Sequence, residues 1–167
     1  MATPESKTAL RMIPYALYLL TAEDEEGNCA AAAVTWVTQA SFQPPLLAVG
    51  VKKDSAGHEL IKKTGHFALN MLGKEQKNVA FSFFKPVQKE GNTIGGEKYH
   101  SGQTGAPVFD SVPAFVECKL IDTLEHGDHS VFLGEVVHAG VNQQPEGRPD
   151  EAILWLKDLG DKLFYGG

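Results

Sequence analysis

The stretch that decides the fold runs from Val34 to Pro45 and reads Val-Thr-Trp-Val-Thr-Gln-Ala-Ser-Phe-Gln-Pro-Pro. Its first residues are β-branched and aromatic, as in a strand, and its final proline pair forms a corner that ends the strand. Hydroxyl and amide side chains recur in it beside the indole of Trp36. Backbone and side-chain groups can therefore line a planar polar heterocycle here, although an ordinary strand and turn explains the same residues equally well.

Two cations and a hydroxyl follow at Lys52, Lys53 and Ser55. The pattern predicts a helix over residues 55–64, with a polar N-cap and with Gly65 as a left-handed residue at its end. Unpaired backbone N–H groups and the helix dipole favour a phosphate at such an N-terminus. A capped helix start exposed to solvent is the alternative, and the residues alone do not choose between the two.

Strand-like segments flank this region on both sides. Residues 16–21 and 30–37 predict a hairpin around a polar turn, and residues 115–125 and 130–139 predict a second hairpin, because apolar and polar residues alternate in its first arm. Residues 46–51 are apolar enough to predict a strand that is buried on both faces.

The remaining segments add a strand, a helix and a long loop. Residues 66–72 predict a strand, and residues 74–84 predict a helix that Pro86 ends. Residues 87–113 are polar and rich in glycine, so we expect a long loop rather than a core element. A mostly β chain with two flanking helices and short connections predicts a small closed or partly closed barrel.

Composition narrows the class of protein. The chain has 167 residues, 43% of them hydrophobic and 22% charged, which predicts one globular domain over residues 1–167. Cys29 and Cys118 lie in apolar runs and are expected to be buried free thiols. A net charge of −6 without a basic stripe argues against a nucleic-acid partner. No apolar run reaches the length of a membrane span, so we expect no membrane partner and a cytoplasmic location.

Several common kinds of catalytic or binding site are not supported. No Gly-x-Gly-x-x-Gly pattern follows a strand, and Glu97 stands where a P-loop requires lysine. No Gly-x-Ser-x-Gly turn is present for a hydrolase nucleophile. His126 and His129 flank a turn and have no further ligand at metal-site spacing, so no metal site is predicted.

In order and spacing, several segments resemble the flavin reductase-like family, whose members share an FMN-binding split barrel. The resemblance extends over nearly the whole chain, from Arg11 to Gly167. Its most specific segments are residues 35–39 with Ser41, the proline pair 44–45, the corner 52–55, and residues 67–72, 105–107 and 127–136.

The resemblance implies a set of binding residues. Those along the isoalloxazine ring and ribityl chain would be Thr35, Trp36, Val37, Thr38, Gln39 and Ser41. Those near the phosphate would be Lys52, Lys53 and Ser55. Gly127 and Asp128 resemble the turn that brings a histidine towards the flavin and the nicotinamide, so His129 is the candidate catalytic residue that positions NAD(P)H; the alternative is a turn residue bonded to Asp128. Phe83 would contact a flavin across a dimer interface.

The function implied by the resemblance is that of an NAD(P)H:flavin oxidoreductase working as a homodimer. Hydride would pass from NADH or NADPH to FMN, or to FAD as an exchanging substrate, and electrons would then pass to free flavin, a monooxygenase, ferric iron or a redox protein. Because the two cofactors carry this chemistry, the protein mainly has to stack them. Two alternatives stay open: an FMN-binding electron relay, and a flavin-storage protein with little NAD(P)H turnover.

Overall fold

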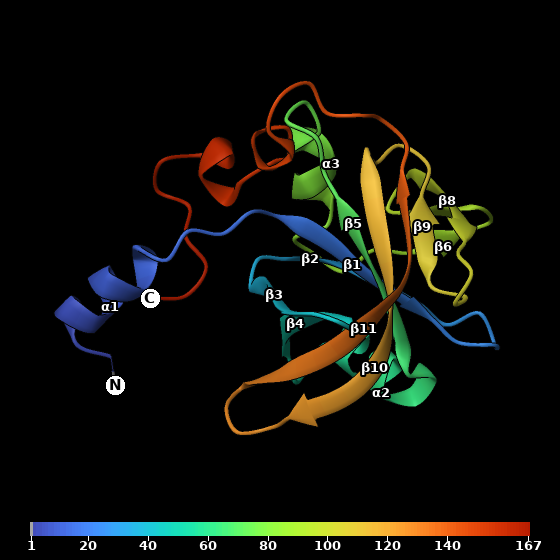
Figure 1. Cartoon of the computed structure of the whole chain (residues 1–167), viewed down its shortest axis with the longest axis horizontal. Coiled ribbons are helices and arrows are strands. Elements are labelled where there is room, and N and C mark those ends of the chain that lie inside the picture. The colour runs from blue at the N-terminus through green and yellow to red at the C-terminus, as the bar shows by residue number, and fades with distance from the viewer. Residues whose placement is uncertain (1) are drawn as a thin grey trace.

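A computed structural model describes residues 2–167 as two antiparallel sheets with short helices around them (Figure 1). The strands of the large sheet are β1 (Tyr18–Glu23), β2 (Cys29–Val34), β3 (Val37–Phe42), β4 (Pro45–Lys52), β5 (His66–Met71), β10 (Ala114–Leu124) and β11 (His129–Val141). Their order is β2-β1-β5-β10-β11-β4-β3. Since β2 and β3 are the two ends of this order, the sheet curls without closing, which confirms the predicted split barrel.

The small sheet and the helices surround this large sheet. The small sheet contains β6 (Lys89–Glu90), β7 (Thr93–Ile94), β8 (Glu97–Ser101) and β9 (Pro107–Phe109). The helices are α1 (Pro4–Arg11), α2 (Ala56–Thr64) and α3 (Lys77–Ser82), with 3-10 turns at Pro149–Glu151 and Leu156–Leu159. In Figure 1, α1 lies beside the end of the chain, on the side of the large sheet away from the small one. Within residues 2–167 no helix is long and apolar enough to cross a membrane.

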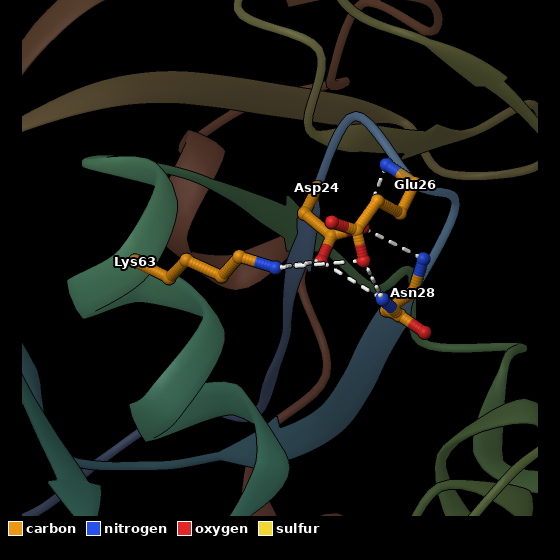
Figure 2. A network of polar contacts seen from close by, with 4 residues as sticks. All are labelled: Asp24, Glu26, Asn28 and Lys63. Carbon is orange, nitrogen blue, oxygen red and sulfur yellow. Dashed lines mark hydrogen bonds and ion pairs between the residues drawn. The ribbon is translucent and has the colours of Figure 1, made fainter.

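The carboxylate of Asp24 stabilises the turn of the β1–β2 hairpin. Asp24 accepts hydrogen bonds from the backbone N–H groups of Glu26 (3.0 Å) and Asn28 (2.9 Å), and Lys63 reaches it from α2 with a 2.6 Å contact (Figure 2). The hydrogen bonds from Lys63 and Asn28 hold the pKa of Asp24 well below its usual range. This network ties the first hairpin to the helix that begins at the predicted phosphate corner.

Asp24→Asn is expected to lower the melting temperature at neutral pH. A carboxyl whose pKa is depressed by folding stabilises the native state above its unfolded pKa of about 4, and this contribution is lost as the pH falls through the folded-state value. The difference in melting temperature between wild type and Asp24→Asn should therefore shrink below about pH 4. Thermal unfolding from acidic to neutral pH measures it. Glu25→Gln, an exposed carboxylate in the same turn with no ion pair in residues 2–167, is the matched control.

The sequence predictions for regular elements are largely confirmed. Ser55 caps α2 by accepting a hydrogen bond from His58 N–H, and Gly65 is left-handed with φ 71°. Both hairpins and the strand β5 are present. The second helix is shorter than predicted, since α3 covers Lys77–Ser82 alone.

Three expectations were wrong. Residues 87–113 are not a long loop outside the core: they form the small sheet, whose Ile94, Val108 and Phe109 are almost fully buried. The strand β4 alternates between buried and half-exposed residues rather than being buried on both faces. Cys29 is half-buried, although Cys118 is fully buried as expected. The helix α1 was not predicted, and none of its residues is buried.

Candidate active site

A cavity of about 730 Å³ lies between the open end of the large sheet and the start of α2. Its walls come from four segments, namely residues 29–35, residues 50–57 without Lys53, residues 83–87 and residues 163–165, together with Leu17, Leu20 and Leu156. The strand β2 contributes a run of alanines to one wall, and these small side chains leave room for a bulky ligand. A volume of this order is typical of sites that enclose a cofactor or small molecule.

The hydroxyl of Thr35 marks the polar position in this wall. Thr35 lines the cavity and is 4% exposed, and its Oγ1 has no hydrogen-bond partner within residues 2–167. A buried hydroxyl left unpaired costs about 1–3 kcal/mol. Because Thr35 belongs to the cavity wall, a small rotation of its side chain toward the polar edge of a ligand would give the hydroxyl a partner and remove this cost. The residues present therefore fit a heterocycle such as flavin.

The corner between β4 and α2 brings groups that favour an anion to the wall of the same cavity. Lys52 and Ser55 both line the cavity. Ser55 Oγ donates to the carbonyl of Lys52 (2.7 Å) and caps the nine-residue helix α2, whose N-terminal N–H groups favour negative charge. His58 is buried, and burial lowers its pKa, so positive charge here comes from the lysines.

The β-sheet register brings the second predicted motif to this corner. His129 pairs with Lys52 across β11 and β4, and Lys53 N–H donates to the Asp128 carbonyl (3.0 Å). The Gly127 turn and the phosphate corner, far apart in sequence, therefore lie side by side. The side chain of His129 is 15% exposed.

Both ring nitrogens of His129 have a partner. Nδ1 lies 2.8 Å from Asp128 Oδ1, and this contact lowers the pKa of Asp128. Nε2 lies 2.7 Å from the hydroxyl of Tyr165. The rings of Trp36 and His129 are 4.7 Å apart, and those of Trp36 and Tyr165 are 5.0 Å apart. Three distant segments thus form one aromatic cluster, and Tyr165 joins it to the cavity wall.

Not every predicted residue lines the cavity. Thr35, Lys52, Ser55 and Phe83 do, and Trp36 and His129 reach it through Tyr165. The residues outside its lining are Val37, Thr38, Gln39 and Ser41 on β3, Lys53, and Gly127 and Asp128 in the turn. The Thr38 hydroxyl donates to the carbonyl of Gln39. Roles for this second set in cofactor binding stay predictions.

Sequence reasoning missed the contribution of residues 163–165. Leu163, Phe164 and Tyr165 line the cavity, although residues 161–167 form no regular element. Tyr165 is anchored by Tyr15, whose hydroxyl accepts from its N–H (2.8 Å) and donates to its carbonyl (2.7 Å). The only signal in the sequence was a cluster of aromatic residues next to two glycines, which does not identify contacts 150 residues away.

Comparison with known proteins identifies the class. The model of the family described as flavin reductase like domain matches residues 10–159, and the chain belongs to this family. The ferric-chelate reductase (NAD(P)H) of Archaeoglobus fulgidus is 32% identical over 142 residues, which cover 83% of this chain and 82% of that protein. The structure of the styrene monooxygenase flavin reductase of Pseudomonas putida S12 superposes with a TM-score of 0.70 at 28% identity, covering 82% of this chain and 87% of that one.

Some relatives are considerably longer. The stachydrine N-demethylase reductase subunit Stc3 of Rhizobium meliloti is 31% identical over 130 residues, which cover 78% of this chain and 55% of that protein. The chain spans about half the length, 40% and 55%, of the two Rhizobium meliloti relatives that it matches.

Proposed function

We propose that this protein is an NAD(P)H:flavin oxidoreductase that binds FMN in the cavity between β2 and α2. The observation that carries the proposal is the unpaired, buried Thr35 hydroxyl in the same cavity as the Lys52 and Ser55 corner. When bound, flavin supplies the two-electron chemistry, accepting a hydride from the reduced nicotinamide.

The roles of the protein groups follow from their places. Thr35 offers a hydrogen bond to a polar edge of the ring, and Lys52 with the N-terminal N–H groups of α2 holds a phosphate. Asp128 accepts the Nδ1 proton of His129, and in that tautomer Nε2 could accept a hydrogen bond from the nicotinamide carboxamide once the Tyr165 hydroxyl, now 2.7 Å away, has moved aside. Phe83 and Phe164 supply apolar surface to the wall of the cavity.

Purified protein tests this function directly. We expect it to bind FMN and to oxidise NADH or NADPH when flavin is supplied, with FAD as a further substrate to compare. An electron relay would bind FMN without reacting with NAD(P)H, and a storage protein would bind it tightly without turnover. Either result would overturn the oxidoreductase proposal. The relatives named as monooxygenase and ferric-chelate components indicate the acceptors to try first.

In the Tyr165→Phe background, which already lacks the hydrogen bond to His129 Nε2, His129→Ala is expected to raise the KM for NAD(P)H about three- to tenfold while FMN still binds, since it removes one hydrogen bond from the nicotinamide. Steady-state kinetics with saturating flavin measures this. His126→Ala changes an exposed histidine of the same turn and serves as the control. An unchanged rate and KM when His129→Ala is added to Tyr165→Phe would show that His129 is a turn residue alone.

We also propose a homodimer. The strands β10 and β11 carry several exposed apolar side chains, among them Ile121, Val131 and Val137, and Phe42 on β3 is 98% exposed. Large apolar side chains left exposed in a single chain are typical of surfaces that a second subunit covers. Light scattering of the purified protein at micromolar concentration should give the mass of a dimer. The mass of a monomer would contradict the proposed homodimer. A cytoplasmic location stays a prediction from the sequence.

A further inference from the structure

Residues 163–167, here called the strap, lie across His129 at the mouth of the cavity. Tyr165 supplies the central contact, a 2.7 Å hydrogen bond between its hydroxyl and His129 Nε2. Arg11 stacks its guanidinium on Phe164 at 4.5 Å from the ring centroid, and its Nε donates to the carbonyl of Gly166 (3.5 Å). The strap is therefore held on one side by α1, which itself buries no residue.

The contact between Tyr165 and His129 uses the nitrogen that the proposed function needs. The Asp128 carboxylate accepts hydrogen bonds, so a proton lies on Nδ1, and in the tautomer with its proton there Nε2 is the acceptor. Burial raises the pKa of Tyr165, so its hydroxyl is protonated and donates. An imidazole nitrogen has one lone pair, and it can accept from Tyr165 or from a nicotinamide carboxamide, but not from both.

We infer that the strap is a gate that competes with the nicotinamide dinucleotide for His129, so that Tyr165 must leave Nε2 before the cofactor's carboxamide binds there. This inference rests on the proposed function. Closure depends on a few modest contacts: the Tyr165 hydroxyl on His129, the two hydrogen bonds of Tyr15 to residue 165, the contacts of Arg11 with residues 164 and 166, and packing against Trp36. Such contacts can open and close without unfolding the barrel.

Gly166 shows how closely the closed strap fits. Its φ is +84°, and a Cβ added there would lie 2.7 Å from Cζ2 of Trp36. Any other residue at this position would push the strap off the indole. Gly166→Ala and Tyr165→Phe therefore weaken the closed state in independent ways, one by steric clash and one by removing a single hydroxyl.

Both variants are expected to lower the KM for NAD(P)H, because the affinity of a ligand for a site that is partly closed is reduced by the closed fraction. The removed hydrogen bond corresponds to about a two- to tenfold decrease in KM for Tyr165→Phe. Tyr99→Phe removes a hydroxyl from the small sheet, outside the cavity lining, and should leave the KM unchanged. A KM that stays the same or rises in both strap variants would overturn the gate.

Hydrogen exchange followed by mass spectrometry gives a readout that does not depend on activity. With oxidised NAD added to the wild-type protein, the peptide covering the strap should exchange faster, since the Tyr165 N–H loses its bond to Tyr15. Slower or unchanged exchange would contradict the gate and would assign Tyr165 to holding His129 in place.

The two proposals can fail separately. If wild-type protein binds flavin and oxidises NAD(P)H but fails these tests, the gate alone is refuted. If wild-type protein has no such activity, the proposed function and the gate are refuted together.

Discussion

Lys52→Ala is expected to weaken FMN binding about ten- to a hundredfold, because a hydrogen bond to a charged group contributes about 1.5–3 kcal/mol. Lys52 lines the cavity beside Ser55, at the N-terminus of α2, and its ammonium is free to leave Asp54, with which it makes an exposed 3.3 Å ion pair. Isothermal titration calorimetry or flavin fluorescence quenching measures the affinity.

Riboflavin separates a phosphate contact from general damage to the cavity. It carries the same ring without the phosphate, so its affinity should be nearly equal in wild type and Lys52→Ala. Lys77→Ala, which removes an exposed cation of α3 outside the cavity lining, controls for net charge. Equal losses for FMN and riboflavin would contradict the placement of the phosphate at this corner.

Gly134→Ala is expected to destabilise the fold by about 1–3 kcal/mol, the usual cost of overpacking a core. A Cβ at residue 134 would lie 2.6 Å from Cζ of Phe67 and 2.9 Å from Cβ of Cys118, and both neighbours are fully buried. Residue 134 lies on β11 between its antiparallel neighbours β10 and β4, where the buried ring of Phe67 leaves no room for a side chain. In a protein of this size the change corresponds to a decrease in melting temperature of about 2–4 °C per kcal/mol.

A double-mutant cycle identifies the clash. Phe67→Leu shortens the side chain that meets the new methyl group, so Gly134→Ala should cost less in the Phe67→Leu background than in wild type. Gly57→Ala is the control, since its Cβ would meet only Ser55 Oγ at 4.0 Å and alanine favours the helix α2. Additive losses in the cycle would show that the close approach at Gly134 is relieved elsewhere.

Local chemistry explains what could be predicted from the sequence. The helix α2 could be placed because Ser55 and Gly65 carry opposite end signals, and the hairpin of β10 and β11 because its residues alternate in polarity. The corner with Lys52 could be proposed as an anion site for the same local reason. The partnership between Lys52 and His129 could not, since it depends on the register of strands that lie about 77 residues apart in the chain.

The small sheet was missed because its strands are too short to show a period. The strands β6 and β7 have two residues each, and glycines at the intervening turns have positive φ, as at Gly95 with 59°. Ile94 is nevertheless fully buried, because the turns fold it back against the core that includes Phe83. A segment rich in turn-forming residues is predicted as a loop from its sequence. Whether such a segment is buried in the core depends on tertiary packing, which the sequence pattern does not show.

Among the cavity residues, too, local sequence predicts some features and tertiary contacts determine the others. Thr35 could be proposed from its neighbours, but its burial without a partner follows from the break between β2 and β3. Tyr165 could not be proposed, because its contacts with His129 and Tyr15 join segments 36 and 150 residues away.

Anaerobic titration of the FMN-loaded protein with NADH and NADPH tests the central claim most directly. The protein should take up added FMN, and one of the two nicotinamide donors should bleach the visible absorbance of the bound flavin. Material that stays colourless after incubation with FMN, or a bound flavin that neither donor bleaches, would contradict a flavin reductase built around Thr35, Lys52 and His129.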